Sequence, residues 1–129
     1  MADLINRNTY GYVEMYDING SYTLESGSAE TDYTELRQYG KVVYGSFAFR
    51  GMSIAQGGYP LLAAKVATMN GVFKPNKTLS IPVYIVDSDS NGKDAFAIFD
   101  TDGCIYLSDS DIPSGKTITE VFGTFTYIA

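Results

Sequence analysis

The chain contains no histidine, no tryptophan and only one cysteine, Cys104, among its 129 residues. Without histidine, the usual zinc ligand sets cannot be assembled and the most frequent acid–base side chain is absent. A single cysteine cannot form a disulfide within the chain, and no histidine is present to activate it as a nucleophile. These absences argue against a metal centre and against nucleophilic catalysis, and the sequence predicts no cofactor and no catalytic residues.

Basic side chains and long apolar segments are also scarce. Nine Lys and Arg stand against fifteen Asp and Glu, which gives a net charge of -6. Such a protein repels a phosphate backbone or an anionic lipid surface. No apolar run approaches the roughly 18 residues that a membrane-spanning helix needs, and MADLINRNTY at the start lacks the basic and apolar regions of a signal peptide. We therefore expect a soluble protein with no nucleic-acid partner and no membrane insertion.

The residues that are abundant favour β-structure. Eleven Tyr, seven Phe and thirteen Gly suit pleated, half-buried surfaces that are joined by tight turns. Residues 34–52 look like two strands joined at Gly40-Lys41, and apolar residues alternate with polar ones along the second of them. The alternation recurs along residues 78–86, 94–100 and 104–108, and it slips near Gly123 in the last segment. The pattern predicts an all-β fold, an antiparallel β-sandwich or jelly roll of seven or eight short strands with at most one short helix.

The chain divides at a polar stretch, ESGSAETDY, at residues 25–33. We interpret residues 1–33 as an N-terminal arm that includes a strand over residues 10–16, and residues 34–129 as the β-sandwich head domain. Residues 60–71 are the only helical option, with Pro60 in the first turn and Gly71 as the stop, although they also fit an extended strand.

Residues 86–96, VDSDSNGKDAF, have two interpretations. Asp87, Asp89 and Asn91 follow the spacing that opens a calcium loop, whereas Asn91-Gly92 is a strong signal for a two-residue β-hairpin turn. A helix-flanked calcium loop needs a bidentate Glu at its twelfth position, where this chain has Ile98, and it needs helices where this sequence predicts strands. The hairpin is therefore preferred and no metal site is predicted, with a looser calcium turn built from Asp87, Asp89, Asn91 and backbone carbonyls as the alternative.

Two pairs of carboxylates could in principle serve a glycosidase, which needs two such groups about 5 to 10 Å apart. They are Asp100 with Asp102, and Asp109 with Asp111. Each pair lies beside Gly, Ser or Pro, where turn formation alone explains an aspartate. We therefore do not expect an enzyme.

Four segments in order resemble a known protein family: LRQYGKVV at 36–43, GVFKPNKTLSIPV at 71–83, AIFDTDGCIYL at 97–107 and VFGTFTYIA at 121–129. Together they are similar to the carboxy-terminal head domains of tailed-bacteriophage tail fibres and receptor-binding proteins. The resemblance covers roughly residues 34–129. It implies a β-sandwich head in the virion, at the tail tip, that forms a homotrimer and attaches to saccharide on a bacterial surface.

Loop residues are the candidates for such attachment. A sugar ring has an apolar face with hydroxyl groups around it, so a site for it needs exposed rings beside Asp, Asn or Gln. The candidates are Gln56, Tyr59, Asp87, Asp89 and Asn91. Each is also explained as an ordinary turn residue or a packed tyrosine. The alternative function is a structural trimerising cap or baseplate component, whose tyrosines are buried against sister subunits.

Overall fold

The computed structural model describes residues 17–129, and the strand expected over residues 10–16 lies outside the described residues. The described chain is all-β, as predicted. Its elements are β1 (Asp17–Asn19), β2 (Ser21–Leu24), β3 (Ser28–Ala29), η1 (Thr31–Tyr33), β4 (Glu35–Tyr39), β5 (Val42–Arg50), β6 (Ala63–Asn70), β7 (Leu79–Asp87), β8 (Gly92–Phe99), β9 (Cys104–Ser108), η2 (Asp109–Asp111) and β10 (Ile118–Ile128), where η marks a 3-10 turn. Between residues 17 and 129, no helix is long and apolar enough to cross a membrane.

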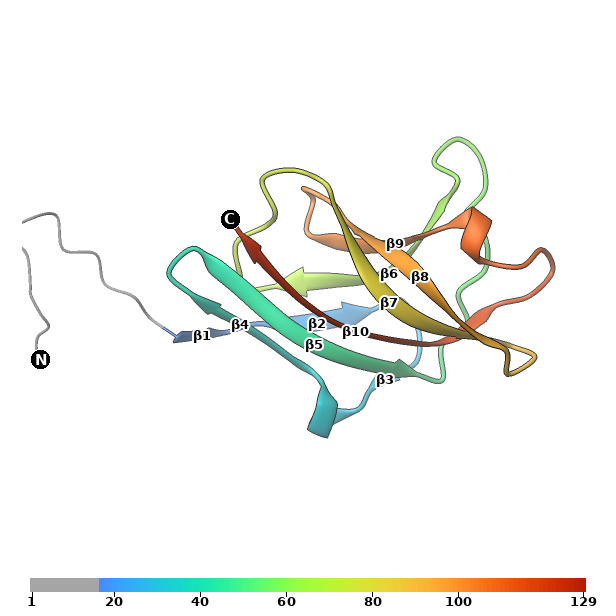
Figure 1. Ribbon diagram of the computed structural model, residues 1–129, viewed down its shortest axis with the longest axis horizontal. Helices are drawn as coiled ribbons and strands as arrows, with labels where there is room; N and C mark the ends of the chain where they lie inside the picture. Colours follow the sequence, from blue (N-terminus) through green and yellow to red (C-terminus); the bar gives the residue numbers. More distant parts are fainter. Residues whose placement is uncertain (1–16) are drawn as a thin grey trace, which may run out of the picture.

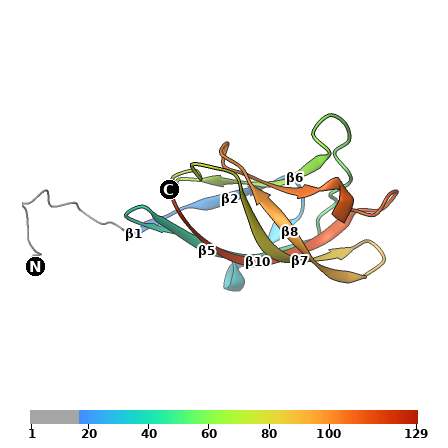
Figure 2. The same cartoon turned by 45° about the horizontal axis from the view of Figure 1, so that its top comes forward.

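The ten strands form one antiparallel sheet that curls until its two edges nearly meet (Figure 1, Figure 2). The strand order is β1-β4-β5-β10-β7-β8-β9-β6-β2, and β3 pairs with β5 outside this path. The edge strands β1 and β2 are consecutive in the chain, with only Gly20 between them. A Cβ at Gly20 would lie 2.6 Å from the carbonyl oxygen of Asn70, so glycine allows the chain to pass from one edge of the sheet to the other.

The segment expected to form an arm takes part in the sheet from residue 17 onward. Strand β1 pairs with β4, β2 with β6 and β3 with β5. Tyr22 on β2 packs edge-on against Phe49, with ring centroids 5.3 Å apart, and donates a hydrogen bond to the carbonyl oxygen of Glu35 at 2.8 Å. Residues 17–33 are therefore part of the same body as residues 34–129, because their apolar side chains help to cover the core.

The core lies inside the curled sheet and is rich in aromatic rings. Phe47 stacks on Phe49 with ring centroids 4.9 Å apart, and Phe99 meets Phe125 at 4.7 Å. All four rings are buried. Each fully buried ring of this size stabilises the fold by about 1.5–3 kcal/mol. The alternation predicted for the second strand of residues 34–52 is confirmed, because Val43, Phe47 and Phe49 are buried on one side of β5.

The helical option at residues 60–71 is wrong, because residues Ala63–Asn70 form strand β6 between β9 and β2. The register with β9 shifts between Lys65 and Ala67, which indicates a β-bulge. The bulge lets Val66 and Ala67 both be buried, although they are adjacent in the sequence. Two consecutive buried residues break the period of two, which is why this segment resembled a helix.

Two local irregularities, one of them predicted near Gly123, lie on the neighbouring strands β7 and β10. The pairing of β10 with β7 ends at Gly123 and Val83, so Pro82, which lacks an N–H, lies where β7 pairs with β8 alone. Gly123 is a site of close approach, because a Cβ there would come within 2.9 Å of both the Phe47 ring and the Val83 side chain. The bulge of β10 itself lies earlier, between Ile118 and Glu120.

Candidate ligand-binding site

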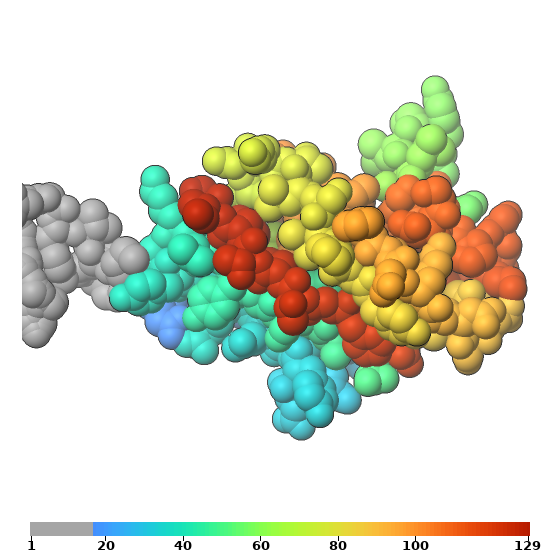
Figure 3. All heavy atoms as spheres, viewed as in Figure 1, coloured from blue at the N-terminus to red at the C-terminus, as the bar shows by residue number. Residues whose placement is uncertain are grey.

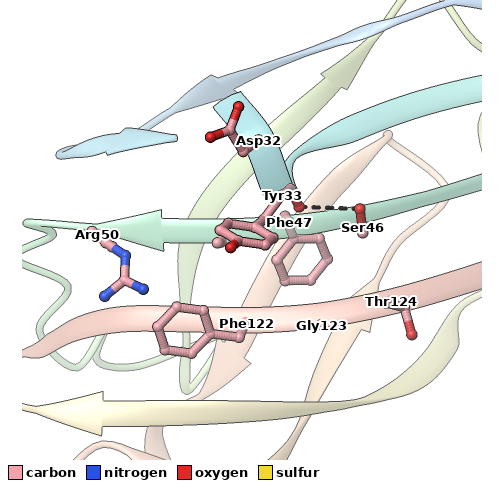
Figure 4. A pocket seen from close by; sticks show the side chains of 9 residues that line it. Asp32, Tyr33, Ser46, Phe47, Arg50, Phe122, Gly123 and Thr124 are labelled. Atoms are coloured by element: carbon pink, nitrogen blue, oxygen red, sulfur yellow. Dashed lines mark hydrogen bonds between the residues drawn. The ribbon is translucent and has the colours of Figure 1, made fainter. Parts of the chain in front are cut away.

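A hollow of about 590 Å³ lies on the outer side of β5 and β10, beneath the turn η1. Its lining consists of residues from these three elements: Asp32, Tyr33, Ser46, Phe47, Ala48, Arg50, Phe122, Gly123 and Thr124. In Figure 4 the Tyr33 ring lies over β5 and the Phe122 ring over β10. Arg50 stands at one end of the hollow and Thr124 at the other.

Hydrogen bonds to β5 hold η1 above the sheet. β4 pairs with β5 as far as Ser46, and β3 pairs from Phe49, which leaves backbone groups of β5 free between them. Ala48 fills this gap, because its N–H donates to the Thr34 hydroxyl at 3.1 Å and its carbonyl accepts from the N–H of Glu30 at 2.9 Å. The Ser46 hydroxyl donates to the carbonyl oxygen of Tyr33 at 3.1 Å. Small side chains at 46 and 48 leave room for the turn.

The two rings of the hollow give it an apolar, accessible surface. Tyr33 is 65% exposed, although it is a large ring, and Phe122 is half-buried at the outward-facing position of β10. Phe122 faces outward because Val121 and Gly123 on either side of it pack against the core. Accessible rings on a strand, or on a turn that is hydrogen-bonded to one, are suited to stacking on flat apolar faces, because they lose little freedom on binding.

Charged groups surround the rings. The Arg50 guanidinium lies over the Phe122 ring, 4.9 Å from its centroid, in a cation–π contact. It also forms ion pairs with Glu30 at 3.6 Å and with Glu120 at 3.5 Å. Asp32 adds a further carboxylate at the η1 side. The hollow therefore combines rings, hydroxyls, a guanidinium and carboxylates, a set that can bind a polar ring by stacking and hydrogen bonding.

The predicted site residue Gln56 has a structural role. Its side-chain amide donates to the carbonyl oxygens of Asp109 at 3.1 Å and Ile112 at 2.7 Å. Tyr59 is different, because it is 90% exposed on the loop between β5 and β6. Figure 3 shows this loop as a knob that projects from the body. Tyr59 is therefore accessible to a partner, whereas Gln56 is occupied in holding the base of the loop.

Asp87, Asp89 and Asn91 form the turn between β7 and β8. The Asp87 carboxylate accepts the N–H groups of Asp89 at 2.8 Å and Asn91 at 3.0 Å, and Asp89 pairs with Lys116. No group of three or more acidic or cysteine side chains within residues 17–129 is arranged to hold a metal ion. These aspartates are therefore engaged by the turn itself.

The predicted Asn91-Gly92 hairpin turn is misplaced by about two residues. The loop runs over residues 88–91, Ser90 takes the left-handed conformation with φ of 64°, and Gly92 already belongs to β8. The Asp87 carboxylate stabilises the earlier turn by capping two N–H groups. Gly92 has a packing role instead, because a Cβ there would overlap the Tyr84 hydroxyl at 1.9 Å.

The predicted residues lie together at one end of the molecule but apart from the hollow. The loop after β5 and the turn after β7 both contact the segment 109–117, through Asp109 and through Lys116 respectively. Figure 1 shows all three segments at the end opposite the C-terminus. Four residues of the hollow were not among the predicted site residues: Asp32 and Tyr33, which lie in the polar stretch 25–33, and Arg50 and Phe122, which lie on strands. The sequence contains one feature that could have pointed to this site, which is the large ring of Tyr33 in an otherwise polar stretch.

The first pair of carboxylates weighed for glycosidase chemistry, Asp100 and Asp102, is engaged in local hydrogen bonds. Asp100 accepts from the Thr78 hydroxyl and the Thr101 N–H. Asp102 accepts from the Cys104 N–H and the Tyr106 hydroxyl. Burial alone would raise the pKa of Asp102, but these hydrogen bonds outweigh it and the pKa is lowered. A general acid needs the opposite shift, so the geometry here stabilises a turn.

Comparison with known proteins returned no match: no protein family, no characterised protein and no solved structure is similar to this chain.

Proposed function

We propose that this protein is a head domain of the tail-fibre or receptor-binding type, which attaches to saccharide on a bacterial surface as a homotrimer in the virion. The observation that supports the proposal most directly is the hollow between η1 and β10. It presents two rings, Tyr33 and Phe122, beside the hydroxyls of Ser46 and Thr124 and the charged groups of Asp32 and Arg50.

A saccharide fits the chemistry of this hollow. A pyranose ring has a patch of C–H groups on one face, which packs on an aromatic ring, and hydroxyls on its edge, which bond to carboxylate, guanidinium and hydroxyl groups. The hollow is shallow, so a single site binds weakly. Three copies on a homotrimer would raise the overall affinity through effective concentration.

One observation favours the alternative, a structural trimerising cap or baseplate component. The outward face of β7 and β8 carries Tyr84 and Phe96, which are 45% and 59% exposed, and the exposed Pro82 opposite Phe96. Such a face would be buried if sister subunits packed on it. The attachment function and the structural cap both require an oligomer, so the oligomeric state does not discriminate between them. Saccharide binding does, because only the attachment function predicts it.

The test is adhesion of the purified protein to a panel of bacterial surface polysaccharides and whole cells. Tyr33→Ala and Phe122→Ala should each weaken adhesion about tenfold, since central aromatic contacts dominate binding energy. Tyr39→Ala, which removes an exposed tyrosine outside the hollow, should leave adhesion unchanged.

Three results would contradict the proposal. If the protein adheres to none of the surfaces, the structural cap would be the remaining function. Loss of adhesion in Tyr59→Ala but not in Tyr33→Ala would move the site to the projecting loop. Release of reducing sugar from a bound polysaccharide would show an enzyme.

A further inference from the structure

The charged side chains in and around the hollow include more carboxylates than basic groups. Three carboxylates, those of Glu30, Asp32 and Glu120, lie in or beside the hollow together with one guanidinium, that of Arg50. Two of the three pair with Arg50, so its charge is already divided between Glu30 and Glu120. Within residues 17–129, no lysine or arginine forms an ion pair with Asp32. The hollow therefore has an excess of negative charge on the side of η1.

This excess disfavours an anionic ligand. Among residues 17–129, Arg50 is the only basic residue that lines the hollow, and an incoming phosphate or carboxylate would compete with two carboxylates that already pair with the guanidinium. Such a ligand would also approach Asp32, a like charge. The net charge of -6 on the whole chain acts in the same direction at longer range.

The same arrangement favours a cation. A positive group near Asp32 would gain a charge partner, and the faces of Tyr33 and Phe122 attract cations through their ring quadrupoles. The guanidinium of Arg50 over Phe122 already shows this ring in contact with a cation. A sugar that carries an ammonium group would use both features. Its ring would stack on Tyr33 or Phe122, and its ammonium group would pair with the carboxylate of Asp32.

We infer that the hollow between η1 and β10 selects a saccharide that carries a free ammonium group, an unacetylated amino sugar, over its neutral N-acetyl form and over anionic polymers. This inference rests on the proposed attachment function and names the ligand class of the same site. Asp32 is the residue that determines the selectivity, and Tyr33 and Phe122 supply the stacking that every sugar would share.

The experiment compares three oligosaccharides of equal length by calorimetric titration: a glucosamine oligomer, its N-acetylated counterpart and a polygalacturonate. The titrations are run at about pH 5.5, where aspartate and glutamate are ionised, and the sugar amine is protonated there as well. At low salt the glucosamine oligomer should bind about two- to fivefold more tightly than the acetylated one, the range of an exposed ion pair, and the polygalacturonate should bind most weakly. Added salt should reduce the difference.

Two variants localise the effect. Asp32→Asn should remove most of the preference for the glucosamine oligomer while binding of the acetylated oligomer is kept. Asp94→Asn, which removes an exposed carboxylate on β8 outside the lining of the hollow, should leave the preference intact. Tyr33→Ala should weaken binding of all three sugars, and that of the glucosamine oligomer somewhat more, because its ammonium group also loses the contact with the ring face.

The outcomes separate this inference from the proposed function. Binding that depends on Tyr33 but favours the acetylated or the anionic oligomer, or a preference that survives Asp32→Asn, would overturn the inference and leave saccharide attachment standing. Absence of binding to all three oligomers would overturn the inference, and the adhesion panel would then decide the attachment function by itself.

Discussion

At the scale of single residues, buried polar groups hold the surface loops to the core. Gln38 is the only polar or charged residue in the buried class among residues 17–129. Its side-chain oxygen accepts the N–H of Phe73 at 2.7 Å, and its amide donates to the carbonyl oxygen of Gly40 at 2.9 Å. The Tyr127 hydroxyl donates to the carbonyl oxygen of Phe73. Both backbone groups of Phe73 are therefore bound by side chains from β4 and β10.

Replacing Gln38 tests this arrangement. Gln38→Leu keeps the volume but leaves the N–H of Phe73 and the carbonyl of Gly40 without their partner, so the free energy of unfolding should fall by about 1–3 kcal/mol. Denaturant titration measures the change. Ser80→Ala, at an exposed position of β7, is the control and should change it little. Equal stability of Gln38→Leu and the wild type would show that these bonds contribute nothing.

Two tyrosine hydroxyls, that of the buried Tyr127 and that of the partly buried Tyr22, set an alkaline limit to stability. Burial raises the pKa of Tyr127 to about 12 from 10.0, and burial, together with Glu35, raises the pKa of Tyr22 further. Because the folded state favours the protonated hydroxyl, this stabilisation is complete below pH 10.0 and is lost as the pH rises toward about 12. The melting temperature should fall over this window, and less so in Tyr127→Phe. A parallel fall in both proteins would contradict the assignment to Tyr127.

At the scale of elements, the loop between β5 and β6 depends on one carboxylate from η2. Asp109 accepts the N–H of Gly57 at 2.7 Å with one oxygen and that of Gly58 at 2.9 Å with the other. A Cβ at Gly57 would lie 1.8 Å from the carbonyl oxygen of Ala63, so glycine is required for the loop to pack at its base. The projecting tip with Tyr59 therefore stands on a fixed base.

Removal of this carboxylate should loosen the loop without unfolding the sheet. Asp109→Ala should raise amide hydrogen exchange at Gly57 and Gly58 by about tenfold and lower the unfolding free energy by about 1–2 kcal/mol, as loss of a capping residue does. Asp111→Ala removes only an exposed ion pair with Lys93 and serves as the control. Unchanged exchange at both glycines in Asp109→Ala would contradict the role of Asp109.

The sequence predicted the elements whose alternation is undisturbed and misjudged those shaped by contacts from elsewhere. β5 and β7 to β9 follow the expected alternation, because one face of each meets the core. β6 was ambiguous because of its bulge, and the turn after β7 was displaced by the Asp87 carboxylate. The hollow could not be predicted, because Tyr33 and Phe122 are 89 positions apart and meet only when η1 folds over β5.

At the scale of the whole molecule, the proposed homotrimer has a candidate contact surface on the outward face of β7 and β8. Tyr84 and Phe96 are exposed there on adjacent strands. Sedimentation equilibrium should give three times the subunit mass of 14.1 kDa, and Phe96→Ser should shift the protein toward the monomer. Ile18→Ser on β1, which also removes an exposed apolar side chain, is the control and should keep the trimer. A monomer at every concentration would contradict the oligomer.

The central claim is that the hollow between η1 and β10 binds saccharide, and mapping of backbone amide shifts by NMR during titration with a bacterial surface oligosaccharide tests it most directly. The account predicts that the shifts gather at Ser46, Arg50, Gly123 and Thr124. Shifts confined to residues 55–62 and 88–91, or no shifts with any oligosaccharide, would contradict it.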